Sequence, residues 1–175
     1  MRHLAPLLSV VLAACSSSSQ PDAAPVDAAP EVAADAPWGD APVPGNGWSI
    51  VPPPGVWLAR HDTTPDRWTF SDAAGAVVVT VQVVPWAGTL ADYESSFCNS
   101  PDQWGWWCTS SPMKLGAHDA LVMHVSRQTD GDAGAVGGFW RYVTVAGGRI
   151  YTFDFDDTIA ASARDASVAT IAISR

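Results

Sequence analysis

Residues 139–155 read FWRYVTVAGGRIYTFDF, and they carry the strongest structural signal in the chain. β-Branched and aromatic residues fill both halves of this stretch, as is typical of strands. Gly147-Gly148 between the halves predicts a tight antiparallel hairpin. Residues 77–84, VVVTVQVV, predict a further, central strand. We therefore expect the folded part to be built on an antiparallel sheet.

Weaker patterns extend this sheet and add two helices. Residues 48–51, 67–71, 113–115 and 119–126 are expected to form strands. Thr89, with Asp92 three residues later, predicts the cap of a helix over 90–97; Ser162 with Asp165 predicts the start of a final helix. Residues 61–62 are expected in a surface loop. Two helices packed on six or seven antiparallel strands predict an α+β sandwich over residues 48–175.

The first 14 residues have the layout of a secretory signal peptide. Arg2 and His3 precede a short apolar run, and small residues lead to Cys15. The run is shorter than the roughly 20 apolar residues of a membrane-spanning helix. It resembles a bacterial lipoprotein signal with its lipobox, which implies cleavage before Cys15 and acylation of that cysteine. Ser16, rather than aspartate, implies sorting to the outer membrane; a plain secretory signal is the alternative.

Residues 15–47 are expected to be the lipidated cysteine and a disordered tether. They are rich in Ser, Ala, Pro and Asp, show no apolar period and contain no basic residue. The whole chain holds 18 acidic and 9 basic residues, a net charge of −9, with no basic stripe. This composition argues against a nucleic-acid partner and against attraction to anionic lipid, so the bilayer contact is assigned to the acyl chains alone.

The two other cysteines, Cys98 and Cys108, predict a disulfide. If Cys15 is acylated, two of the three cysteines remain, and two cysteines in an oxidising envelope are expected to pair. A metal or redox site lacks support, because the spacing is not Cys-x-x-Cys and no histidine lies between them.

Several short motifs occur in a recognisable order. They are Trp48-Ser49-Ile50-Val51-Pro52, Gly88-Thr89-Leu90-Ala91-Asp92-Tyr93, Leu115-Gly116-Ala117-His118 and Ile150-Tyr151-Thr152-Phe153. In this order residues 48–175 resemble the PsbP-like superfamily, including envelope lipoproteins of the LpqN and DcrB type. The resemblance implies an antiparallel sheet with helices packed on it, and an accessory or binding role without a shared catalytic motif.

The sequence offers weak candidates for chemistry and for metal binding. His118 and His124 would lie about 20 Å apart along a strand, too far for one ion. Residues 154–157 lack the glycine and closing glutamate of a calcium loop, so neither a metal nor a cofactor is expected. The enzymatic alternative is an envelope hydrolase that uses Asp154 and Asp156, or a His/Asp pair.

Tryptophan is the better functional signal. Three of the nine, Trp104, Trp106 and Trp107, fall within the segment between the paired cysteines, among Asp, Gln, Gly and Ser. In an exposed loop they would anchor a glycan, a peptide or an envelope protein. In a buried loop they would pack under the sheet. The sequence leaves both interpretations open and predicts a non-catalytic binding module.

The lipobox interpretation predicts the fate of Cys15→Ser. Lipid transfer needs the thiol, so this variant should remain an unprocessed precursor that takes up no fatty-acid analogue in metabolic labelling. Equal labelling of the variant and the parent would refute lipidation at Cys15.

Overall fold

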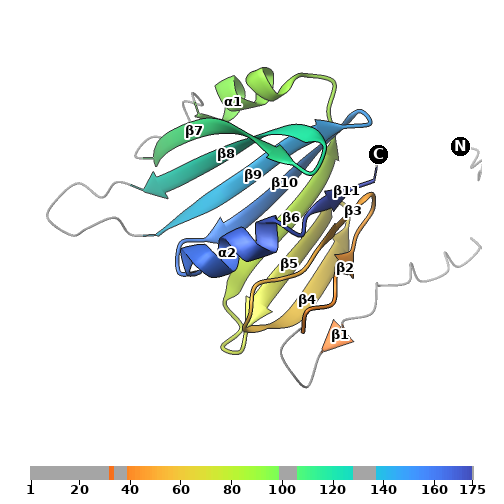
Figure 1. The fold of residues 1–175 in the computed structure, drawn as a ribbon, viewed down its shortest axis with the longest axis vertical. Helices are drawn as coiled ribbons and strands as arrows, with labels where there is room; N and C mark the ends of the chain where they lie inside the picture. Colours follow the sequence, from red (N-terminus) through yellow and green to blue (C-terminus); the bar gives the residue numbers. More distant parts are fainter. Residues whose placement is uncertain (1–31, 34–38, 99–105, 128–136, 175) are drawn as a thin grey trace, which may run out of the picture.

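The computed structural model describes residues 32–33, 39–98, 106–127 and 137–174, and every structural statement below concerns these residues. Eight strands form one antiparallel main sheet (Figure 1). Their order across the sheet is β1 (Val32–Ala33), β4 (Val56–Thr63), β5 (Asp66–Asp72), β6 (Val77–Pro85), β10 (Arg149–Asp156), β9 (Gly138–Ala146), β8 (His118–Arg127) and β7 (Trp106–Leu115).

The remaining elements cover the main sheet. A small antiparallel sheet of β11 (Ala172–Ile173), β3 (Trp48–Ile50) and β2 (Val43–Pro44) lies on one face together with α2 (Ala161–Val168) (Figure 1). Helix α1 (Leu90–Cys98) packs on the opposite face, against β7 and β9. We call these faces the α2 face and the α1 face.

The two faces carry separate cores because side chains alternate along each strand. On the α2 face, Tyr151, Phe153 and Phe155 of β10 are fully buried. Phe153 makes an edge contact with Trp48 of the small sheet, with ring centroids 5.9 Å apart. On the α1 face, Ile150 joins Met123 and Val143 under the helix. The main sheet thus carries an apolar cluster on each face, and the cluster on the α1 face lies under the helix.

The structure confirms the strongest sequence signals and enlarges the sheet. Strands β9 and β10 form the hairpin across Gly147-Gly148, and β6 is central. The main sheet has eight strands instead of six or seven, and the helices are a minor part of the fold. Strand β4 went unrecognised: His61 and Asp62 lie within it, so the predicted surface loop is wrong. The polar residues 60–64 show no alternation of apolar and polar side chains, so the sequence does not predict this strand. Its position is fixed by its pairing with β5.

Other boundaries also change. Strand β7 begins at Trp106 rather than at residue 113. Helix α2 follows Ala160, which provides no side-chain cap, so the capping box predicted at Ser162 and Asp165 is wrong. Strand β2 pairs with β3 and buries Val43, so the folded part begins before residue 48, inside the predicted tether.

The cap predicted for α1 is confirmed. The Thr89 amide donates to Asp92 Oδ2 at 2.7 Å, and the Asp92 amide donates to Thr89 Oγ1 at 3.1 Å. The hydrogen bonds from the Thr89 amide and then the Thr89 hydroxyl lower the pKa of Asp92.

The buried Tyr151 hydroxyl has no hydrogen-bond partner among the described residues. Tyr151→Phe should therefore raise the free energy of unfolding by about 1 kcal/mol in a denaturant titration, because an unpaired buried hydroxyl is unfavourable. Tyr93→Phe is the matched control and should lower the free energy of unfolding, because the Tyr93 hydroxyl accepts a hydrogen bond from Arg141. Destabilisation by Tyr151→Phe would contradict this view of the core.

Candidate functional site

A disulfide joins the end of α1 to the start of β7, as predicted. Cys98 and Cys108 are bonded, with their Cα atoms 5.4 Å apart. In the chain-entropy model, closing a ring of this length stabilises the fold by roughly 2–3 kcal/mol. The bond ties the first residues of β7, among them Trp106 and Trp107, to a helix that is itself packed on the sheet.

A charged cluster on β9 and β10 contacts the same helix. Arg141 Nε and Nη2 donate to the two carboxylate oxygens of Asp154 at 2.6 and 2.5 Å, and Nη1 donates to the Tyr93 hydroxyl at 2.8 Å. The guanidinium also lies over the Phe97 ring, 4.3 Å from its centroid. Arg141 thereby connects β10 to the apolar side of α1.

The pKa values in this cluster follow from its burial. Burial alone would lower the pKa of Arg141, but the hydrogen bonds and charge of Asp154 outweigh it, and the net pKa is raised. Burial also raises the pKa of Tyr93, against the opposing charge of Arg141. Both groups therefore keep their protons at neutral pH and act as fixed hydrogen-bond donors or acceptors.

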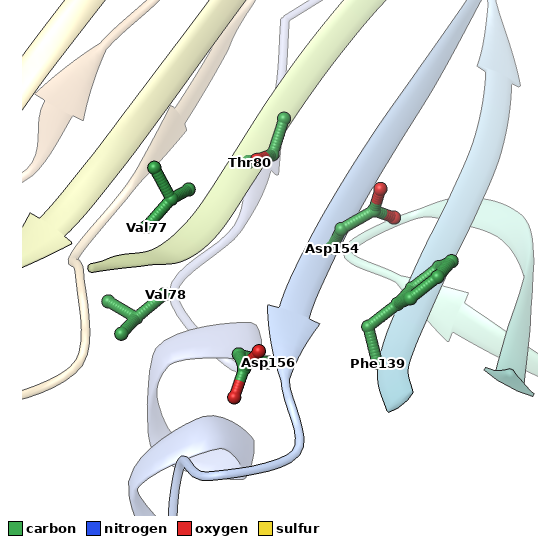
Figure 2. Close-up of a pocket in the computed structure, with 6 residues that line it drawn as sticks. All are labelled: Val77, Val78, Thr80, Phe139, Asp154 and Asp156. Atoms are coloured by element: carbon green, nitrogen blue, oxygen red, sulfur yellow. The ribbon is translucent and has the colours of Figure 1, made fainter. Parts of the chain in front are cut away.

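An open depression of about 170 Å³ lies beside this cluster on the α1 face. Figure 2 shows Asp154 and Asp156 on β10, Phe139 on β9, and Val77, Val78 and Thr80 along β6. The depression is small compared with the several hundred Å³ typical of sites for small molecules.

The two aspartates suggested for a hydrolase are occupied with structural contacts. Both oxygens of Asp154 accept hydrogen bonds from Arg141. Asp156 Oδ1 accepts from the Thr158 amide at 2.9 Å and from its hydroxyl at 2.5 Å, which closes the turn after β10. Both side chains line the depression, but each carboxylate is engaged in hydrogen bonds that hold the fold together.

The three candidate tryptophans do not share one loop. Trp104 lies outside the described residues, Trp106 is the first residue of β7, and Trp107 is the second. The Trp107 side chain is 62 % exposed. Of the two interpretations that the sequence leaves open, Trp107 therefore fits the exposed one, although the residue lies in a strand and not in a loop.

Trp107 belongs to an uncovered surface that we call the wing: Trp107, Thr109, Ser111 and His124, on the α2 face of β7 and β8. Thr109 lies opposite His124, which in turn lies opposite Trp140 of β9. Neither α2 nor the small sheet extends over this end of the main sheet (Figure 1). Accordingly, Thr109 and Ser111 are exposed.

A histidine–aspartate pair borders the wing. His124 Nε2 lies 3.2 Å from both carboxylate oxygens of Asp157, and its ring stacks on Trp140 with centroids 4.4 Å apart. Arg164 of α2 lies 4.3 Å from the Trp140 ring centroid. A Cβ atom on Gly138 would stand 2.3 Å from Asp157 Oδ2, so only glycine admits the carboxylate there. The tertiary fold, and no sequence motif, assembles this group.

A second pair repeats the arrangement at the other end of the sheet. His61 Nε2 lies 2.9 Å from Asp66 Oδ1, and the His61 ring stacks on Trp68, 4.5 Å between centroids. In the described part of the chain, neither histidine hydrogen-bonds to a serine, threonine or cysteine that could act as a nucleophile. The spacing of His61 and Trp68 about a short turn would have indicated this pair, had the strand been recognised.

Across the described ranges, no three His, Cys, Asp or Glu side chains come together as a metal-binding group. Neither described helix has both the length and the apolar character that crossing a bilayer requires.

Comparison with known proteins gives a fold likeness only. No family model and no curated protein sequence matches the chain. Similar solved structures include cyanobacterial PsbP (CyanoP) from Synechocystis sp. PCC 6803, at 17 % identity and a TM-score of 0.44, over 73 % of this chain and 82 % of that one. Another, from Bacteroides thetaiotaomicron VPI-5482, has 15 % identity and a TM-score of 0.43, over 76 % of this chain and 47 % of that one.

The Arg141 cluster predicts a large effect of Asp154→Asn on stability. The variant should lower the free energy of unfolding by about 2 kcal/mol, because it leaves the guanidinium without its charge partner. Breaking a fully buried pair costs about 3–5 kcal/mol, and the value here is smaller because both side chains are partly exposed. Asp119→Asn is the control, since its partner Lys114 and its own side chain are mostly exposed, and it should change little. Equal effects in a denaturant titration would contradict a structural role for the cluster.

Proposed function

We propose that the chain is a lipid-anchored binding module of the bacterial cell envelope that performs no catalysis of its own. Acyl chains on Cys15 would hold it in the outer membrane, since two or more chains anchor a protein stably. The proline- and alanine-rich residues after Cys15 would serve as a spacer between the bilayer and the folded domain. Its partner would be a glycan, a peptide or another envelope protein.

The exposed Trp107 on the wing is the observation that carries the binding role. An indole combines a large apolar face with one polar N–H group, and such side chains dominate binding energetics where they contact a partner. The Cys98–Cys108 disulfide fixes Cys108, which directly follows Trp107 in β7. A surface already held in its binding conformation loses less entropy on association.

The hydrolase alternative gains no support from the contacts described above. Its two aspartates are engaged by Arg141 and Thr158, and the His61 and His124 pairs lie without a hydrogen-bonded nucleophile among the described side chains. The wing is therefore the surface that we assign to the proposed function.

Trp107→Ala should weaken binding without unfolding the domain. Immobilised full-length protein in detergent should retain fewer components of an envelope extract when it carries this substitution, while its melting temperature stays close to that of the parent. Val77→Ala is the matched control, because Val77 is 49 % exposed but lines the depression on the α1 face. Retention that is equal for both variants and the parent would refute the wing as the working surface.

A further inference from the structure

We infer that the wing binds an uncharged oligosaccharide, with one sugar ring stacked on Trp107 and hydroxyl groups of that ring bonded to Thr109 and the His124–Asp157 pair. A further ring would reach Ser111, about 14 Å along β7 from Trp107. This inference rests on the proposed function and specifies its ligand. A pyranose ring has an apolar C–H face and a rim of hydroxyl groups. The wing presents the complementary set: one exposed indole, two exposed hydroxyl side chains and a polar pair at its border.

The spacing of these groups suits an oligosaccharide, with one ring at Trp107 and the next toward Ser111. Thr109 lies directly opposite His124, and Trp107 lies diagonally from His124, because its own partner is Ser126. Cβ atoms of opposite residues in an antiparallel pair are about 5 Å apart, and diagonal neighbours about 7–8 Å apart. A ligand stacked on the indole would therefore have polar side chains within reach along one edge.

The charge of the surface favours a neutral ligand. His124 faces Asp157 at 3.2 Å, and Arg164 faces Asp165 at 3.2 Å. Arg164 thus lies beside a carboxylate, and both oxygens of Asp157 lie at hydrogen-bond distance from His124 Nε2, so the border presents neither group alone to an ion. A neutral ligand that forms many hydrogen bonds is the best electrostatic match for such a surface.

The apolar area is too small for a protein partner. Stable protein interfaces bury more than about 1,000 Å² and have an apolar centre. Trp107 and Val77 are the exposed large hydrophobic residues of the described chain, and Val77 lines the depression on the opposite face. On the wing, the indole is surrounded by hydroxyl and imidazole groups, which match the rim of a sugar.

The polar border is held in place before any ligand arrives. Gly138 admits the Asp157 carboxylate, and the Asp157 amide donates to the Gly138 carbonyl at 3.2 Å. Trp140 supports the face of the His124 ring. Such fixed positions favour directional hydrogen bonds to hydroxyl groups, because little rotamer entropy is lost on binding.

Two glycan probes test the inference: protease-treated, protein-free cell-wall sacculi in a sedimentation assay, and a soluble tetramer of N-acetylglucosamine in calorimetry. Both use the full-length protein in detergent. The parent should bind at least one probe, Trp107→Ala should weaken that binding at least tenfold, and Trp107→Phe should retain part of it. Asp157→Asn should weaken it less, and Val77→Ala should leave it unchanged.

The outcomes separate this inference from the proposed function. Binding of neither probe by the parent, or equal binding by the parent and Trp107→Ala, would overturn the saccharide assignment. If an envelope extract is nevertheless retained in a Trp107-dependent way, the wing remains the binding surface and its ligand is a protein or peptide. If retention of the extract is independent of Trp107, the proposed surface itself is wrong.

Discussion

The burial of β10 on both faces is the constraint on which the rest of the structure depends. Its pairing with β6 and β9 places Tyr151, Phe153 and Phe155 on one side and Ile150 on the other. Each side must be covered, because large apolar side chains are stable only when removed from water. The small sheet and α2 cover the first side, and α1 covers the second at one end of the sheet.

The functional surfaces lie where this cover ends. On the α2 face, β7 and β8 extend past α2, and their side chains change from apolar to hydroxyl, imidazole and one indole. On the α1 face, Arg141 and Asp154 mark the border of the second core and connect it to Tyr93. The first border exposes groups that are suited to binding, whereas the second engages its charged groups in holding α1.

Predictability followed the strength of local signals. The β9–β10 hairpin, β6 and the cap of α1 depend on neighbouring residues, and the sequence predicted all three. Strand β4 contains Arg60, His61 and Asp62, and short strands such as β2 have too few residues for any period to be visible. Their positions depend on partners far away in the chain, which a local pattern does not encode.

By itself, the sequence determined the antiparallel class of the fold, the pairing of Cys98 with Cys108 and the residue types available for binding. Composition, turn chemistry and cysteine number are properties of the sequence itself, so they do not depend on contacts between distant segments. Only the tertiary structure decided which side chains meet. Trp107, His124 and Asp157 come from β7, β8 and the turn after β10, and their proximity results from strand register and from the space left by Gly138. Register depends on pairing between distant segments, so the candidate site emerged only once the sheet was assembled.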